Sequence, residues 1–324
     1  MPHLTVRALI ALVACAITLT GSKAAFAQDS SEKTLPEKYL RISRNKENKP
    51  QSLDTAVVSF APKSGAKNVT VDLVGAIHIG DAKYFETLDR LFEDYDIVLY
   101  EMVKPKDKPP VHGLQNGDGS PLALLQRLLP SMLDLHYQVD SIDYSAENFV
   151  HADLTPEELG EAMRKRGENG MTLFIKVVKE VLQQYQKEWA SGGSLSGNVS
   201  DAQILAFLTQ KEGARQLKEM LAEKLDEFGP DMGLGATLDS ILIVDRNRAA
   251  MKELKNQLAN HDGKKPLRIA VYYGAAHMPD MASLLTDEFG MQMRDISWVQ
   301  AWDMTRTPKT SALQGLMQLL QQGQ

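Results

Sequence analysis

Hydrophobic residues along the first third of the chain alternate with polar ones in the period of two that is typical of β-strands. Residues 55–60 and 69–74 are rich in β-branched side chains, and Pro62, Gly65 and Asn68 interrupt the pattern between them. Because short, turn-rich connections join antiparallel neighbours, the pattern predicts that these two strands form a β-hairpin.

The second strand is followed by hydrophobic residues at helical spacing. Asp81 is the expected N-cap, and apolar side chains recur every three or four positions up to Phe92. Residues 96–101 then form a short apolar run that ends at Glu101. A strand, a helix and a strand in this order predict a βαβ unit, in which the two strands are parallel.

The same order of elements recurs near the C-terminus. Residues 267–273 predict a strand, and residues 281–289 predict a helix with Asp280 as its cap and Gly290 as its terminator. Residues 293–299 predict one more strand.

The middle of the chain has helical periodicity. Thr155, Pro156 and Glu158 have the spacing of a capping box with proline at the first helical position. The sequence therefore predicts one α/β domain over residues 51–310, in which a helical insertion at about 105–235 interrupts a central mixed β-sheet. Helices are expected within or beside the insertion at residues 121–135, 171–190, 213–228 and 237–258.

The two ends of the chain differ from this domain. Residues 1–27 combine a positive charge, an apolar run and the small-residue sequence Ala25-Phe26-Ala27, which is the layout of the cleavable signal peptide of an exported, periplasmic or secreted bacterial protein. The run is too short to span a bilayer, so no transmembrane segment is expected in the mature chain. Cys15 offers the alternative of a lipoprotein anchor. Residues 28–50 are expected to be a flexible lead-in, and residues 311–324 a polar tail.

Charge and cysteine content exclude several classes of function. The formal net charge is −6, and it becomes −8 once the two basic residues of the signal peptide are removed. Such an acidic chain is not expected to bind nucleic acid. Cys15 is the only cysteine, so the mature chain has no disulfide and no thiolate nucleophile, and a metal site would use His, Asp and Glu.

One motif occurs twice, at the ends of two predicted strands. The sequence Gly-Ala-x-His-x-x-Asp contains His78 in its first copy and His277 in its second. Ligands bind at the carboxyl ends of the strands in an α/β sheet, so two related strand–Gly-x-x-His–helix half-units would direct both histidines into one site. Glu101 ends the strand after the first unit and is expected at the same edge of the sheet.

Two imidazoles and one carboxylate are a common ligand set for a divalent first-row metal ion. Such an ion lowers the pKa of a bound water toward neutrality, which suits hydrolysis. Glu101 is either the third ligand or the general base, and the spacing does not separate these roles. His151 and Asp153 are either further metal ligands or part of the loop before Thr155.

Arg246 follows the apolar residues 241–244 and belongs to a predicted helix. Near the site, its guanidinium would stabilise an oxyanion or hold a carboxylate. The alternative is a solvated position on an amphipathic helix.

Four short segments together resemble the TraB/GumN/TIKI superfamily. They are VGAIHIGD, IVLYE, DRNRAAM and YYGAAHMPD, and the resemblance covers residues 71–103 and 241–303. It implies a fold similar to the erythromycin-esterase/ChaN group and a metal-dependent, peptidase-like hydrolase site.

The resemblance also implies residue roles. His78 and His277 match the two motif histidines, Glu101 matches the acid, and Arg246 and Asn247 match the Arg-Asn pair on a late helix of the family. The expected cofactor is a divalent ion, Mn, Co or Zn, and the expected substrate is a peptide or a small molecule.

A different class of function stays open from the sequence. A non-catalytic metal-binding or haem-binding protein of the ChaN-like type would use the same sheet edge. In that protein Tyr100, Tyr272 and Tyr273, which lie near the predicted strand ends, would be candidate iron ligands.

Overall fold

A computed structural model describes residues 35–36, 39–63, 68–106, 108–109, 133–167, 211–228 and 243–306. Several predictions concern residues outside these ranges. They are the signal peptide with Cys15, the first part of the lead-in, most of the helix at 121–135, the helix at 171–190 and the tail at 311–324.

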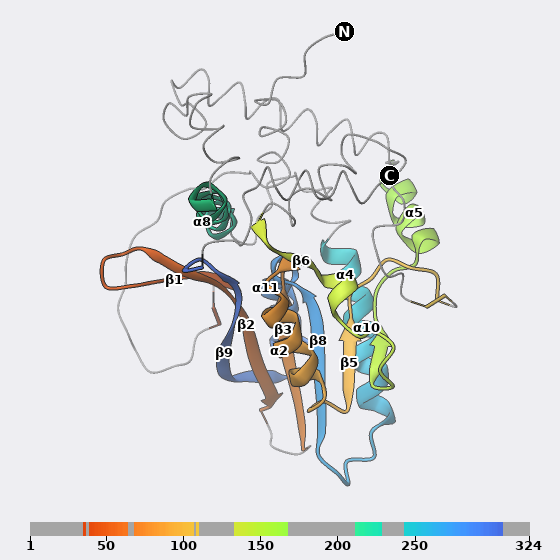
Figure 1. Cartoon of the computed structure of the whole chain (residues 1–324). Helices are drawn as coiled ribbons and strands as arrows, with labels where there is room; N and C mark the ends of the chain where they lie inside the picture. The colour runs from red at the N-terminus through yellow and green to blue at the C-terminus, as the bar shows by residue number, and fades with distance from the viewer. Residues whose placement is uncertain are drawn as a thin grey trace.

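Seven strands form one mixed sheet, and helices cover both of its faces, so the fold is α/β (Figure 1). The strands are β1 (Leu40–Arg44), β2 (Pro50–Pro62), β3 (Val69–Ala76), β5 (Ile97–Tyr100), β7 (Phe149–His151), β8 (Leu267–Gly274) and β9 (Met291–Asp303). The neighbouring strands β3, β8, β5 and β7 are parallel. The antiparallel strands β1, β2 and β9 extend the sheet beyond β3.

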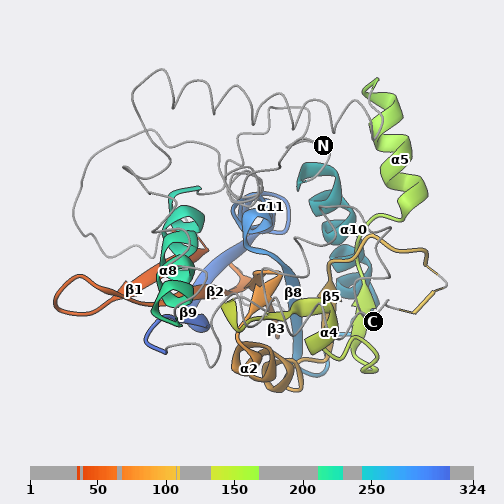
Figure 2. The ribbon, with the colours of Figure 1, turned by 45° about the horizontal axis from the view of Figure 1, so that its top comes forward.

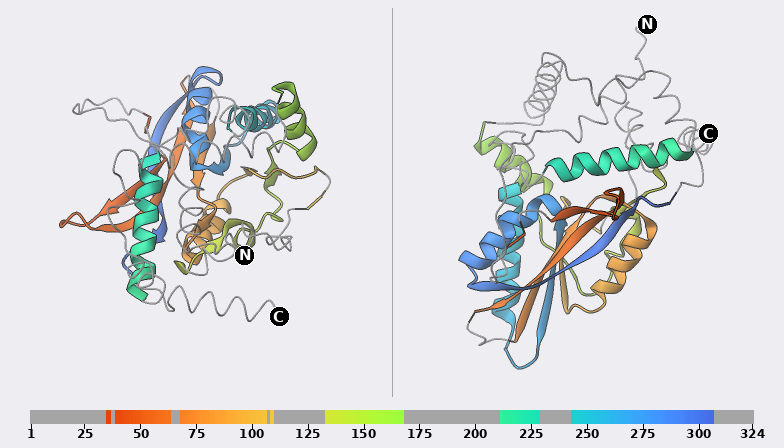
Figure 3. Two further views of the ribbon diagram at one scale, coloured as in Figure 1. Left: turned by 90° about the horizontal axis from the view of Figure 1, so that it is seen from above. Right: turned by 90° about the vertical axis from the view of Figure 1, so that its left-hand side faces the viewer.

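The helices lie in two layers. On one face are α2 (Ala82–Phe92) and α4 (Gln138–Ser141), and on the other are α10 (Asp245–Asn260) and α11 (Met278–Asp287) (Figure 3). Helix α8 (Lys211–Phe228) crosses over β1 and β2, and α5 (Pro156–Lys165) follows β7 (Figure 2). Among the described helices, none combines the length and the apolar character that crossing a membrane requires.

The predicted hairpin is confirmed, because β2 and β3 pair antiparallel from Val57 opposite Val74 to Phe60 opposite Val71. The predicted βαβ strands, β3 and β5, are also parallel, but they are not neighbours. Strand β8 lies between them and pairs in parallel with both. The central strand of the sheet therefore comes from the C-terminal part of the chain.

The pairing of β3 with β8 brings the two copies of the histidine motif to the same end of the sheet. Ala76 lies opposite Gly274, so the two strands end together. His78 lies two residues beyond β3, and His277 ends the short 3-10 helix η2 (Ala275–His277) that follows β8. A two-residue strand β4 (Ile79–Gly80) after His78 pairs separately with β6 (His136–Tyr137).

Alternation along the strands divides the buried side chains into two hydrophobic cores, one on each face of the sheet. Tyr272 packs in the core under α2, and its neighbour Tyr273 packs in the core under α10 and α11. Both are fully buried. Burial of apolar surface on both faces is the main stabilisation of such a sheet.

Strand β1 forms within the segment that was expected to be a flexible lead-in, residues 28–50. Its sequence, LRISR, is short and charged, so the local pattern gave only a weak strand signal. Tertiary contacts order it: Arg41 Nε donates to Asp54 Oδ2 at 3.1 Å, and the same guanidinium lies 4.2 Å from the centroid of the Trp298 ring.

The helix-cap predictions had different outcomes. The capping box of Thr155 and Glu158 is confirmed at the start of α5. Asp81 occupies the N-cap position of α2, but its side chain makes no capping hydrogen bond to that helix. Asp280 is not a cap, because it lies inside α11, whose N-cap residue is His277.

The carboxylate of Asp81 instead joins three parts of the chain. Its Oδ1 accepts from Lys218 Nζ of α8 at 2.8 Å, and its Oδ2 accepts from the backbone N–H of Asp303 in β9 at 2.5 Å. The ammonium group of Lys218 is nearly buried, so this contact ties α8 to the loop that carries His78.

Gly80 is packed too closely for a side chain. A Cβ atom there would lie 2.7 Å from Cδ1 of Tyr84, whose hydroxyl is held by Thr55. We expect Gly80→Ala to lower the free energy of unfolding by about 1–3 kcal/mol, because overpacking forces neighbours to move. Gly160→Ala, in the exposed helix α5, should instead raise it by about 0.5–1 kcal/mol. Urea unfolding checks both, and equal effects would contradict the packing argument.

Candidate functional site

The predicted site residues surround Gly274 at the end of β8. A Cβ atom at Gly274 would lie 3.3 Å from Glu101 Oε2, 3.5 Å from His277 Cδ2 and 4.0 Å from His78 Nε2. The missing side chain of this glycine thus leaves the space on which two imidazoles and one carboxylate converge. They come from the ends of three parallel strands.

Glu101 extends from the end of β5 and is held by three groups. The backbone N–H of Gly274 donates to Oε2 at 2.6 Å, while Oε1 lies 2.7 Å from Arg246 Nη2 and 3.6 Å from His277 Nε2. Burial by itself raises the pKa of this carboxyl. In the acidic range where Glu101 titrates, the protonated rings of His277 and His78, the guanidinium of Arg246 and the amide of Gly274 outweigh burial and lower the pKa to about 2. Glu101 is therefore ionised at neutral pH.

Arg246, the second residue of α10, holds two carboxylates. Its Nε donates to Asp153 Oδ1 at 3.0 Å and its Nη2 donates to Asp153 Oδ2 at 2.5 Å, beside the contact with Glu101. Burial lowers the pKa of the guanidinium, but the hydrogen bonds with Asp153 and the charge of Glu101 raise it above its ordinary value. Of the roles that the sequence left open for Arg246, the geometry shows the carboxylate clamp.

His277 is buried and oriented from behind by Asn247. Its Nδ1 lies 2.6 Å from Asn247 Oδ1, and Asn247 Nδ2 donates to the carbonyl oxygen of His277 at 3.3 Å and to Asp280 Oδ2 at 2.7 Å. Burial lowers the pKa of His277 despite the neighbouring Glu101. Asn247 is itself fully buried and touches the ring edge opposite to Glu101, so it is a positioning residue.

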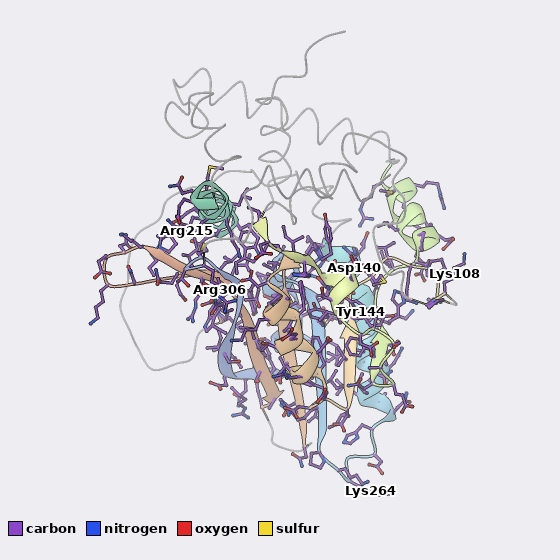
Figure 4. All side chains as sticks on the ribbon, viewed as in Figure 1. Lys108, Asp140, Tyr144, Arg215, Lys264 and Arg306 are labelled. Atoms are coloured by element: carbon purple, nitrogen blue, oxygen red, sulfur yellow. The ribbon has the colours of Figure 1, made fainter. Side chains whose placement is uncertain are left out.

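His78 is more exposed and is oriented by Gln138. Its Nδ1 lies 3.1 Å from Gln138 Oε1, and Gln138 Nε2 donates to the hydroxyl of Tyr144 at 2.8 Å. The carbonyl oxygen of His78 also accepts from the backbone N–H of Gln138 at 2.9 Å. Figure 4 shows Tyr144 beside α4, close to β5, and Lys264 at the opposite end of the sheet.

Sequence reasoning missed Gln138 and the role of Asp153. The side chain of Asp153 has no exposed surface, and its place just after β7 was the one signal that could have linked it to the site. Its neighbour His151 does not join the site, because its Nε2 lies 2.6 Å from the carbonyl oxygen of Met102. Gln138 belongs to no recognisable motif, and only the tertiary structure brings it to His78.

The three tyrosines that were candidate iron ligands face the hydrophobic cores. Tyr273 donates its hydroxyl hydrogen to the carbonyl oxygen of Ala152 at 2.5 Å, and the Tyr272 ring packs 4.7 Å from that of Phe92. Burial raises the pKa of both phenols well above the ordinary value, and it also raises the pKa of Tyr100. This environment disfavours the phenolate form that binds iron.

The two histidines are placed as metal ligands would be, but Glu101 is not free to act as the third ligand. His78 and His277 turn ring edges toward the same space, but both oxygens of Glu101 already have partners in Arg246 and Gly274. Across the part of the chain that the structure describes, no three or more His, Cys, Asp or Glu side chains are grouped as a metal site.

In comparisons with known proteins, no protein-family model, no curated protein and no solved structure matches the chain.

The contacts of Arg246 predict that two arginines of α10 contribute very differently to the free energy of unfolding. Arg246→Ala leaves Glu101 and Asp153 buried without their cation, so the free energy of unfolding should fall by about 3–5 kcal/mol. Arg248 pairs with Glu288 at the surface, so Arg248→Ala should cost no more than about 1 kcal/mol. Denaturant unfolding of the two variants measures this, and equal losses would mean that the buried ion pairs do not stabilise the fold.

Glu101 also predicts an acid-dependent loss of stability. Its pKa is about 2 in the folded chain against about 4.3 when unfolded, so the stabilisation is complete above that higher value and is lost as pH falls toward 2. The loss is on the order of 3 kcal/mol. Glu101→Gln should have a lower free energy of unfolding than wild type at neutral pH, and this difference should become smaller as the pH falls. For Glu86→Gln, at an exposed position of α2, the free energy of unfolding should change with pH as it does in wild type. A difference between Glu101→Gln and wild type that does not change with pH would refute this assignment.

Proposed function

We propose that the protein is an exported, metal-dependent hydrolase of peptidase type, with its reaction centre between His78, His277 and Glu101. One observation carries the proposal: the Nε2 atom of His277 faces the ionised Glu101 Oε1 at 3.6 Å, while Nδ1 is taken by Asn247. A ring nitrogen with a lone pair repels a carboxylate oxygen. A cation or a proton between them removes that repulsion.

Formal charge supports a cation at this position. Two buried carboxylates, those of Glu101 and Asp153, share the guanidinium of Arg246, and burial lowers the pKa of His277, which favours its uncharged form at neutral pH. The buried cluster therefore carries an excess of negative charge, which is costly in a low-dielectric environment. A positive ion beside Glu101 offsets this cost.

The two histidines are suited to be the ligands of that ion. Each uses Nδ1 for an amide oxygen, which leaves Nε2 of His78 toward Gly274 and Nε2 of His277 toward Glu101 Oε1. Metal-binding histidines generally have such a hydrogen bond on the second ring nitrogen. Imidazoles accept Mn, Co and Zn alike, so the donor types do not select one of these metals. A divalent ion held there would supply Lewis acidity and lower the pKa of a water that it binds.

Glu101 has a role in this proposal that differs from that of a strong base. With a pKa of about 2, it accepts hydrogen bonds rather than protons at neutral pH. It would orient the attacking water by accepting one of its hydrogens. Arg246 and Asp153 keep the carboxylate fixed while it does so.

We also propose that the chain is a distant relative of the TraB/GumN/TIKI superfamily, built from two half-units with a helical insertion between them. The support is that β3 with α2 and β8 with α11 each give a strand, a histidine turn and a helix, and that both turns open at one sheet edge. A peptide substrate and export through residues 1–27 belong to the same proposal.

Metal binding tests the proposal directly. A ligand at about a hundredfold excess over its Kd stabilises a fold by about 2.7 kcal/mol, and each kcal/mol moves the Tm of a chain of this size by roughly 2–4 °C. Adding Mn, Co or Zn to chelator-treated protein should therefore raise the Tm by several degrees. His78→Ala and His277→Ala should lose most of this shift together with peptide hydrolysis.

The matched control is His261→Ala, at the end of α10, which should keep both properties. If the metal raised the Tm of wild type, His78→Ala and His277→Ala equally, the ion would bind elsewhere, and the proposed reaction centre would be wrong.

A further inference from the structure

We infer that Asp280 is a positioning residue that fixes the amide of Asn247 and, through this amide, the tautomer of His277. Asp280 is the last residue of the second Gly-Ala-x-His-x-x-Asp motif, and it lies in the first turn of α11. Its Oδ2 accepts a hydrogen bond from Asn247 Nδ2 at 2.7 Å. The inference concerns a ring proton and holds whether or not the site hydrolyses peptides.

The orientation of the Asn247 amide follows from its two partners on one side. Asp280 Oδ2 and the carbonyl oxygen of His277 can only accept hydrogen bonds, so the NH2 group of Asn247 must face them. Its Oδ1 then faces His277 Nδ1 at 2.6 Å. An amide oxygen cannot donate, so Nδ1 carries the hydrogen. In the neutral ring, Nε2 is left with its lone pair toward Glu101.

Burial makes this orientation strict. Asn247 is fully buried and His277 is 5% exposed, so water is not at hand to satisfy the reversed amide. Reversal would turn Asn247 Oδ1 toward the carboxylate of Asp280, and two acceptors at hydrogen-bond distance repel. A hydrogen bond to an ionised acceptor is also stronger than one between neutral groups. Asp280 therefore contributes the larger part of the preference.

His78 lacks an equivalent constraint. The amide of Gln138 donates to the hydroxyl of Tyr144, and a hydroxyl can either donate or accept. Both orientations of Gln138 are therefore compatible with that partner. Asp81, the matching aspartate of the first motif, binds Lys218 and the backbone of Asp303 instead. The two motif copies thus differ: one histidine has a fixed tautomer, and the other has an adjustable one.

NMR of the full chain with ring-labelled histidine tests the inference without an activity assay. The ring carbon and nitrogen shifts distinguish the Nδ1–H tautomer from the Nε2–H tautomer, and His277→Gln identifies the signal among the seven histidines. Near pH 8, above the ordinary histidine pKa of about 6.5, the wild-type His277 should show the Nδ1–H form. In Asp280→Ala the ratio of the two tautomers should shift roughly tenfold or more toward Nε2–H.

Two variants separate positioning from general destabilisation. Asp280→Asn keeps the shape of the side chain but can turn either an oxygen or an NH2 group toward Asn247, so it should lose the preference for the Nδ1–H form as Asp280→Ala does. Asp287→Ala, at the exposed end of the same helix, should leave the spectrum unchanged. The inference is overturned if wild-type His277 is an Nε2–H tautomer, a result that needs no variant to fold. It is also overturned if folded Asp280→Ala keeps the wild-type ratio.

Discussion

A guanidinium held between two buried carboxylates is the interaction on which the site depends. Arg246 comes from α10, Glu101 from the end of β5, and Asp153 from the turn after β7. None of these charges is tolerable in the interior alone, and each is compensated by the others. The cluster therefore ties a helix on one face of the sheet to the ends of two strands, and it keeps Glu101 ionised next to the histidines.

The second constraint is geometric. Strands β3 and β8 end together, and Gly274 lacks a side chain at the point where Glu101, His277 and His78 approach. Any side chain there would contact all three groups. The electrostatic cluster fixes the carboxylate, and the glycine provides the room in which the imidazoles can meet it.

Local patterns in the sequence predicted the hairpin of β2 and β3, the strands β5, β8 and β9, and the helices after β3 and β8, but they did not predict β1 or β7. His78, His277 and Glu101 could be selected because parallel strands present their carboxyl ends at one edge. The insertion of β8 between β3 and β5 could not be foreseen, since periodicity carries no information about strand order. Gln138 was not recognisable for a similar reason, because its role depends on contacts between distant segments.

The two motif aspartates show how local reasoning fails in a specific way. Asp81 and Asp280 each precede or begin a helix, where a carboxylate is favourable in its own right, so a cap was the simplest prediction. In the folded chain, each carboxylate accepts a side-chain hydrogen bond from a distant segment. Asp81 accepts from Lys218, and Asp280 accepts from Asn247. Helix propensity decides where such a residue is tolerated, and tertiary contacts decide what it does there.

The central position of β8 also has a consequence for how the molecule is made. A ribosome releases β3 and β5 long before β8, so these two strands have no partner for their facing edges until residues 267–274 emerge. Pairings between such distant segments form late and slowly, because a long loop must close first. The imidazole of His277 and the N–H of Gly274 arrive with the same strand. The nascent chain therefore has no assembled candidate site until residues 267–277 have left the ribosome, although His78 and Glu101 are made much earlier.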